Sequence, residues 1–272
     1  MTTTEQEGQA GVLGEIAGIY RDSCKERDIF WNVYVARPLA AVLVYGLRRT
    51  PITPNQVTFL GAFSFLGVAA ALILMRDWSG MLVAAAILQF AYLLDCADGQ
   101  LARLEGMTSE VGAHLDFLID EIKALLLVGA FAVRLWWIEG EVIWLFVGIA
   151  GVALVSMATS LTNFVRRPAY AGREIEPGES ARRTGGPPEG LVPRALWAIQ
   201  SLASWLVHYP SWFVYLALLD GLPAVDGSRW FLYLFLGVYA LYTAKTGLGV
   251  VVKLGRPAFY EDDRLEQESE KP

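Results

Sequence analysis

Long stretches of uncharged, apolar residues constrain this chain more than any other feature of its sequence. Four such stretches contain no charged residue, and two more, at 124–138 and 230–252, are each interrupted by a single basic residue. A helix needs roughly 20 predominantly apolar residues to cross the hydrocarbon core of a bilayer. We therefore expect an all-α, polytopic membrane protein. Its six predicted transmembrane helices are 55–76, 80–104, 108–138, 141–166, 197–220 and 229–253.

The composition agrees with a membrane protein and excludes several other classes. Of the 272 residues, 54% are hydrophobic and 18% are charged, which is more apolar than an ordinary soluble domain. The nine Trp and eleven Tyr suit membrane interfaces. Two cysteines, Cys24 and Cys96, are too few for a disulfide framework. The net charge of −6 argues against nucleic acid as a partner.

The basic residues predict how the chain is oriented in the membrane. Arg76, Arg134 and Arg229 fall in or beside the three loops on one side, whereas the tails and loops of the other side carry most of the remaining Lys and Arg. Basic residues concentrate on the cytoplasmic side of membranes, so we expect both termini to be cytoplasmic. Neither a signal peptide nor an Asn-x-Ser/Thr site is visible, which fits a bacterial cytoplasmic membrane.

Changes in polarity along the chain divide it into four segments. Residues 1–27 are predicted to form an N-terminal cytoplasmic segment. Residues 28–49 contain an apolar, aromatic stretch that favours an interfacial amphipathic helix, or alternatively a partly buried ordinary helix. The six-helix domain is expected over 50–256. The acidic tail, 257–272, is expected to be disordered and cytoplasmic.

Four carboxylates carry the chemistry that this sequence predicts. Asp95 and Asp98 share one helical face, and Asp116 and Asp120 share another, so two antiparallel helices can bring all four to one point. By the predicted orientation, this point lies at the cytoplasmic edge of the second and third spans. Acids this close repel each other in a medium of low dielectric constant unless cations compensate them. Oxygen ligands alone favour Mg²⁺, Mn²⁺ or Ca²⁺.

Small and basic residues beside these acids predict a phosphate-containing ligand. Gly112 lies one turn before Asp116, and Gly99 and Ala102 follow the first acid pair, so a bulky ligand can approach the backbone there. Arg103 can bind a phosphate through its planar set of donors. Each residue alone has a structural explanation, such as helix packing or anchoring of a helix end. The complete set at these spacings favours a ligand site.

The same residues resemble a known family. Asp95-x-x-Asp98-Gly99-x-x-Ala102-Arg103, eight residues, then Gly112-x-x-x-Asp116-x-x-x-Asp120, is similar at all eight fixed positions to the signature of the CDP-alcohol phosphotransferases, also called CDP-alcohol phosphatidyltransferases. The resemblance extends over about 50–253. Asn55 and Thr58, in the string that opens the first span, match a family string that faces the cytidine nucleotide.

The resemblance implies a phospholipid-biosynthetic enzyme, a transferase of substituted phosphate groups that moves phosphatidyl from CDP-diacylglycerol to a small polar alcohol and releases CMP. It implies two divalent metal ions, Mg²⁺ or Mn²⁺, held by the four aspartates, with Asp120 also acting as the catalytic base. It further implies a homodimer. Aromatic and small residues of the third and fourth spans could form its contact or could equally face lipid, namely Trp136, Trp137, Trp144, Gly148 and Gly151. The nucleotide-binding residues that it implies are Asn55, Thr58, Asp98, Gly99, Ala102, Arg103 and Gly112.

The acceptor alcohol is not specified by these motifs. Basic residues that could hold it are Arg166 and Arg167 at the end of the fourth span and Lys245 within the sixth. The sequence from Thr162 to Arg167 keeps only part of the basic string of relatives that use inositol phosphate, so a phosphorylated acceptor is neither favoured nor excluded. Lys123, one turn after Asp120, has no firm assignment; pairing with an acid of the site is one interpretation.

Three other functions stay open at this point. The CDP could carry the head group, with diacylglycerol as the acceptor, because hydropathy does not distinguish the two arrangements. A transporter is a weaker alternative, since its acids would more naturally lie near the middle of the membrane and in repeated halves. A non-catalytic membrane scaffold is also weaker, because every acid of the motif is present.

Overall fold

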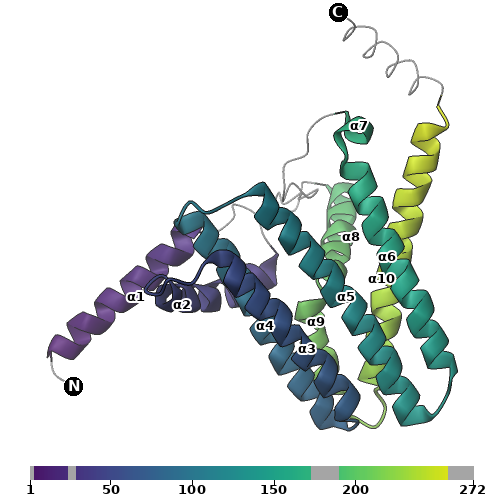
Figure 1. The fold of residues 1–272 in the computed structure, drawn as a ribbon, viewed down its shortest axis with the longest axis horizontal. Coiled ribbons are helices and arrows are strands. Elements are labelled where there is room, and N and C mark those ends of the chain that lie inside the picture. Colours follow the sequence, from purple (N-terminus) through teal and green to yellow (C-terminus); the bar gives the residue numbers. More distant parts are fainter. Residues whose placement is uncertain (1–2, 24–28, 173–189, 257–272) are drawn as a thin grey trace, which may run out of the picture.

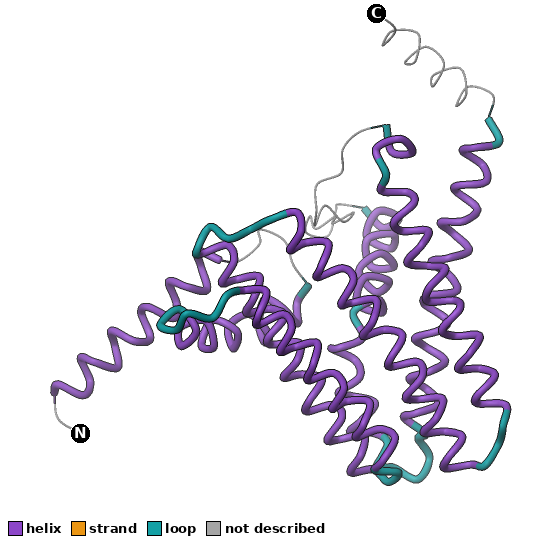
Figure 2. The backbone as a smooth tube through the Cα atoms, in the orientation of Figure 1, coloured by secondary structure: helices purple, strands orange, loops and turns teal. Residues whose placement is uncertain are grey.

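The computed structural model describes residues 3–23, 29–172 and 190–256, and within these ranges the chain is helical, without strands (Figure 2). This confirms the predicted all-α class. The tail at 257–272, predicted to be disordered, lies outside the described residues. The helices are α1 (Thr3–Ser23), η1 (Asn32–Ala36), α2 (Arg37–Leu47), α3 (Pro54–Leu74), α4 (Trp78–Leu104), α5 (Glu110–Glu139), α6 (Ile143–Arg166), α7 (Pro168–Ala171), α8 (Leu191–Val207), α9 (Tyr209–Leu219) and α10 (Gly227–Leu254).

The long helices form one bundle (Figure 1). α3 packs along α4, α6 packs along α10, and α5 contacts both pairs. Within the described ranges, four helices are long and apolar enough to cross a membrane, namely α3, α4, α6 and α10. They match four of the six predicted spans. The chain is therefore a membrane protein, and the exact number of six spans stays a prediction.

The third predicted span, 108–138, corresponds to α5, which is long enough to cross a bilayer but carries charged side chains along its length. Asp116 and Asp120 lie in its first half, and Lys123 and Arg134 are buried inside the bundle. All four side chains lower the apolar character of α5, and the two basic ones face other parts of the protein. Charged groups inside membrane helices typically face the bundle interior in this way.

The fifth predicted span, 197–220, was wrong as a single helix. The structure begins helix α8 at Leu191 and interrupts it at His208, whose backbone angles (φ −88°, ψ 70°) are not helical; α9 follows directly. Pro210 lies in the first turn of α9. Proline lacks the backbone N–H that a continuous helix would need at this position, and its ring would clash with the carbonyl four residues earlier. The break therefore follows from the local sequence.

The amphipathic segment predicted at 28–49 corresponds to η1, a short π-helix, followed by α2. Together with α1, α2 lies across one end of the α3–α4 pair (Figure 1). The contact has its own small core, in which Ile19, Val44, Val57, Leu94 and Leu101 are buried. The N-terminal segment, 1–27, thus contains a helix that packs against the end of the bundle where the sequence motif lies.

Two helix starts near this end are defined by side-chain caps. Thr53 and Gln56 form a reciprocal capping box at the start of α3, and the Ser109 hydroxyl accepts a hydrogen bond from the Gly112 amide at the start of α5. Such caps satisfy amides that have no partner inside the helix. Gly106, with φ +64°, forms the turn between α4 and α5 in a conformation that favours glycine.

The main core lies in the middle of the bundle and is rich in stacked aromatic rings. Phe131 of α5 and Phe231 of α10 stack with ring centroids 4.2 Å apart, and Phe213 of α9 meets both edge-on. Gly148 and Gly151 on α6 are buried, and a Cβ atom at these positions would come within 2.6 and 2.7 Å of α5 side chains. These two glycines thus serve packing inside the chain.

A buried arginine holds the opposite end of the bundle together. The Arg134 side chain, 1% exposed, donates to the Ser228 hydroxyl at 3.0 Å and to the backbone carbonyls of Leu72, Met75 and Asp77. It therefore joins α5 to the α3–α4 turn and to the start of α10. The Leu72 and Met75 carbonyls lie at the end of α3, where carbonyls lack a partner within the helix, so Arg134 satisfies groups that burial would otherwise leave unpaired. The Asp77 carbonyl also accepts a hydrogen bond from the Gly80 amide.

We expect Arg134→Met to lower the free energy of unfolding, because each buried carbonyl left without a donor costs roughly 1–3 kcal/mol. Lysine should not restore stability, since its single ammonium cannot reproduce the planar fork of donors. Thermal unfolding of the nanodisc-reconstituted protein measures the effect. Arg76→Met is the matched control, because Arg76 is exposed and its guanidinium stacks over the face of the Trp137 ring. Equal unfolding midpoints for the two variants would contradict this role of Arg134.

Candidate active site

The acidic motif lies where α4 ends and α5 begins. Asp95 and Asp98 occupy the last third of α4, and Asp116 and Asp120 occupy the first third of α5. The turn between the helices reverses the chain, so α4 and α5 run in opposite directions, as the sequence predicted. One face of each helix therefore contributes acids to the same end of the bundle.

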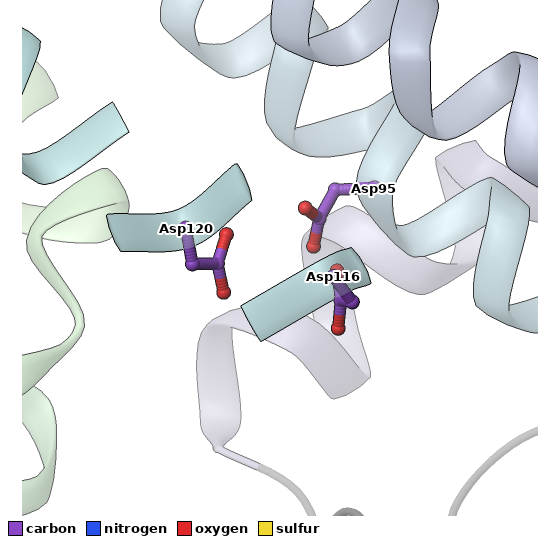
Figure 3. Close-up of side chains that lie close together, drawn as sticks. All are labelled: Asp95, Asp116 and Asp120. Atoms are coloured by element: carbon purple, nitrogen blue, oxygen red, sulfur yellow. The ribbon is translucent and has the colours of Figure 1, made fainter. Parts of the chain in front are cut away.

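Three of the four carboxylates converge. Asp95, Asp116 and Asp120 each offer an oxygen, and these oxygens lie within 4.8 Å of one another. Figure 3 shows the three side chains directed toward a common space, Asp95 from α4 and the other two from α5. Asp95 is half-buried, whereas Asp116 and Asp120 are exposed. Ligands reaching this space can therefore approach from outside the bundle.

Asp98 faces a different partner. Its side chain is buried and accepts a hydrogen bond from the Thr58 hydroxyl, with 2.5 Å between the oxygens. This contact joins α3 to α4 and brings together two residues that the sequence assigned to the ligand site. Asp98 is one turn from Asp95 on α4 but is not among the three converging carboxylates.

Lys123 compensates part of the negative charge. Its buried ammonium donates to Asp95 at 2.6 Å and to Asp120 at 3.0 Å. The sequence left this residue without a firm assignment, and pairing with the acids is the interpretation that the structure confirms. Helical spacing alone predicts the contact with Asp120, three residues earlier. The contact with Asp95 depends on how α4 and α5 pack.

The donor atoms of the cluster fit a hard divalent cation. All three converging groups are carboxylates, which suit Mg²⁺, Mn²⁺ and Ca²⁺. The Lys123 ammonium pairs with two of these three carboxylates, Asp95 and Asp120. A cation bound among these oxygens would reduce the remaining repulsion.

Residues predicted to bind the nucleotide lie on the same end of the bundle. Asn55, exposed in the first turn of α3, lies near Gly112, since its side-chain oxygen would be 3.7 Å from a Cβ added there. A Cβ atom added at Gly99 would likewise lie 3.4 Å from a guanidinium nitrogen of Arg103. Both glycines thus leave space beside polar side chains.

Arg103 connects the site to the N-terminal helix. Its Nε donates to the backbone carbonyl of Ser23, the last residue of α1, at 2.7 Å. Ala102, the preceding residue, is partly exposed at the same end of α4. The position of Arg103 therefore depends on a segment outside the sequence motif.

The basic residues predicted for the acceptor are more scattered. Arg166, at the end of α6, lies over the ring of Phe117, the neighbour of Asp116, at 5.7 Å. Arg167 ends that helix and is exposed. Lys245 is also exposed, on α10. Of the three, Arg166 has a described contact with a residue adjacent to the acid cluster.

A cavity beside Asp120 was not predicted from the sequence. It has a volume of about 240 Å³ and lies between α5, α6, α8 and α10. The sequence feature that could have indicated the cavity is the pair Tyr239 and Tyr242. These two polar side chains lie one turn apart in the otherwise apolar helix α10. The residues lining the cavity are Phe117, Asp120, Glu121, Ala158, Thr159, Thr162, Leu206, Val207, Phe235, Val238, Tyr239 and Tyr242.

Known proteins with similar sequences include phosphatidylinositol phosphate synthases. The chain is 33% identical to that of Corynebacterium glutamicum over 105 residues, which cover 38% of this chain and 43% of the relative. It is 30% identical to that of Mycobacteroides abscessus over 192 residues, covering 67% and 78% of the two chains. The first of these alignments thus spans less than half of the relative.

A comparison of structures found a crystal structure of Mycobacterium tuberculosis phosphatidylinositol phosphate synthase with CDP-DAG bound. It has a TM-score of 0.46 and 20% sequence identity, with 79% of this chain and 94% of that chain covered. The sequence profile described as CDP-alcohol phosphatidyltransferase matches residues 51–221, more than half of the chain. The protein therefore belongs to the CDP-alcohol phosphatidyltransferase family.

Proposed function

We propose that this protein transfers the phosphatidyl group of CDP-diacylglycerol to the hydroxyl of an alcohol and releases CMP. The observation that carries the proposal is the convergence of the Asp95, Asp116 and Asp120 carboxylates from two helices at one end of a membrane bundle. Membership of the family supports the reaction class. The names of the relatives, phosphatidylinositol phosphate synthases, support phosphatidyl as the transferred group.

Two divalent ions, Mg²⁺ or Mn²⁺, are the proposed cofactors. Asp95, Asp116 and Asp120 would hold them, with Asp98 as a further ligand. When bound, the ions would neutralise the diphosphate and stabilise the charge that develops on the departing CMP. The oxygen-only donor set and the convergence of three carboxylates support this assignment.

The remaining residues of the motif would bind and orient the nucleotide. Asn55 and Thr58 open α3, and Gly99, Ala102 and Gly112 leave the backbone accessible beside them. Arg103, whose Nε also donates to the Ser23 carbonyl, would pair with a phosphate oxygen through its planar guanidinium. Positioning is the main contribution required of a protein in phosphoryl transfer.

Asp120 is the proposed base. It belongs to the acid cluster and also lines the cavity, so an alcohol in the cavity would place its hydroxyl between the carboxylate and the donor. The alcohol oxygen would form a bond to the phosphorus that carries diacylglycerol, and the bond from that phosphorus to the bridging oxygen would break. CMP would leave with the bridging oxygen, and the hydroxyl proton would pass to Asp120.

The proposal also covers where the enzyme works. The positive-inside pattern supports a cytoplasmic active site and cytoplasmic termini in a bacterial cytoplasmic membrane. A homodimer is proposed from the family resemblance, with exposed surfaces such as that of Trp137 as contacts in place of the buried Gly148 and Gly151.

Replacing Asp120 by Asn should reduce turnover by about 10²–10⁴-fold, the usual contribution of a positioned general base. CMP release from CDP-diacylglycerol in lipid vesicles with Mg²⁺ or Mn²⁺ measures turnover, and a chelator should abolish it. Glu110→Gln is the matched control, because Glu110 is an exposed acid on the first turn of the same helix.

We expect the Asp120→Asn protein to unfold at nearly the wild-type temperature and to retain CDP binding. Turnover close to wild type in Asp120→Asn would remove this residue from the proposed role. Full activity of the wild-type protein in the presence of excess chelator would contradict the proposed metal dependence.

Replacing Lys123 by Met should destabilise the metal-free protein selectively. Asp95 and Asp120 would lose their shared cation, and a hydrogen bond to a charged group contributes roughly 1.5–3 kcal/mol. Added Mn²⁺ should restore most of the lost stability, because it compensates the same carboxylates. Thermal unfolding with chelator and with Mn²⁺ measures both states.

Lys123→Arg is the conservative variant and should behave closer to wild type, since it keeps the charge. A packing role for the lysine stem predicts something different: Lys123→Met would then lose equal stability with chelator and with Mn²⁺. That result would show that Lys123 does not compensate the charge of the acid cluster.

A further inference from the structure

The cavity beside Asp120 has a wall composition that bears on which alcohol can enter. One side is formed by Phe117, Asp120 and Glu121 of α5, and the opposite sides come from α6, α8 and α10. Asp120 belongs both to this wall and to the acid cluster, so the cavity opens directly onto the proposed reaction centre. Its volume of about 240 Å³ suits a small molecule.

We propose that this cavity binds the acceptor and selects an alcohol that carries no phosphate group, such as an uncharged polyol. This inference rests on the proposed function and adds the chemical class of the acceptor to it. Three features support it: the charge of the wall, the position of the basic residues predicted to hold the acceptor, and the polar groups that the wall offers.

The charge of the wall disfavours an anion. Asp120 and Glu121 are the charged side chains among the described residues that line the cavity, and none of these residues is Lys or Arg. Metal ions at the acid cluster could compensate Asp120, whereas Glu121 is outside that cluster. A phosphate inside the cavity would therefore lose its hydration without gaining a cationic partner, which is strongly unfavourable.

Arg166 and Lys245, two of the basic residues predicted to hold the acceptor, do not line the cavity. The Thr162 hydroxyl of α6 and the Tyr242 hydroxyl of α10 are 2.7 Å apart and connect the two helices at the cavity wall. Arg166 follows Thr162 by one turn, and Lys245 follows Tyr242 by three residues, both toward the ends of their helices. Neither base lines the cavity, and Arg166 lies over the ring of Phe117, which does.

The polar groups of the wall suit an alcohol with several hydroxyls. Thr162, Tyr239 and Tyr242 are hydroxyl-bearing, and Glu121 can accept hydrogen bonds from a polyol. The rings of Phe117 and Phe235 provide apolar surfaces that can pack against the C–H groups of such a molecule. Ligand sites typically combine a largely apolar wall with a few polar groups of this kind.

Matched acceptor pairs test the inference. CMP release from CDP-diacylglycerol would be measured with inositol against inositol phosphate, glycerol against glycerol phosphate, and serine against phosphoserine, at equal metal concentration. The members of each pair differ only by the phosphate. We expect one unphosphorylated alcohol to have a kcat/KM at least about tenfold above that of its phosphorylated form, because charge mismatches inside a dry site cost more than 1.4 kcal/mol.

Thr162→Arg tests the cavity itself by placing a cation in its wall. It should raise the KM for the preferred uncharged alcohol and lower that for the phosphorylated partner, while the KM for CDP-diacylglycerol stays unchanged. Asn163→Arg adds the same charge to the next residue of α6, which is exposed and does not line the cavity. This control should leave all three KM values near those of the wild-type protein.

The outcomes separate the two proposals. Metal-dependent CMP release with phosphorylated acceptors alone would support the enzyme and overturn the inference about its acceptor. A Thr162→Arg protein that changes the KM for CDP-diacylglycerol alone would show that the cavity binds a lipid chain, which also overturns the inference. No CMP release with any acceptor, from a protein that unfolds cooperatively, would overturn the proposed function and the inference with it.

Discussion

The ion pairs of Lys123 with Asp95 and Asp120 are the interaction on which the site depends. Carboxylates from two helices cannot converge at the edge of a membrane unless something offsets their repulsion. Lys123 supplies part of this charge from within the bundle, and it bonds to one acid on each helix. The same contacts therefore join α4 to α5 and keep the carboxylates directed toward one space.

A second buried cation acts on the same helix. Arg134 follows Lys123 by eleven residues, which is close to three helical turns, so both project from one face of α5 about 16 Å apart. Lys123 binds carboxylates at one end of the bundle, and Arg134 binds backbone carbonyls at the other. These contacts hold α5 against its neighbours at two positions along its length. The charged residues that make α5 less apolar therefore also determine where it lies.

The sequence predicted what depends on local spacing and missed what depends on how helices meet. Apolar length predicted α3, α4, α6 and α10, and the i, i+4 spacing of Asp116 and Asp120 predicted that both face the acid cluster, whereas Asp98 contacts Thr58. The break at His208 could have been read from Pro210, which lies in the first turn of α9. The contacts of Arg103 with Ser23 and of Lys123 with Asp95 join residues 80 and 28 positions apart. The periodic spacing of residues within one helix cannot predict contacts between residues so far apart in the sequence.

The difference between local spacing and helix packing also explains why the sequence motif does not specify the acceptor. The signature residues lie on α4 and the start of α5, the helices that hold the proposed metal and nucleotide groups. The cavity shares Asp120 with them, but its other walls come from α6, α8 and α10, where the signature has no residue. Chemistry common to a family can therefore stay constant while a substitution at a position such as Thr162 would alter the charge of a neighbouring wall. In this arrangement the residues proposed to carry out the reaction and those proposed to select the alcohol meet at one carboxylate and can vary separately.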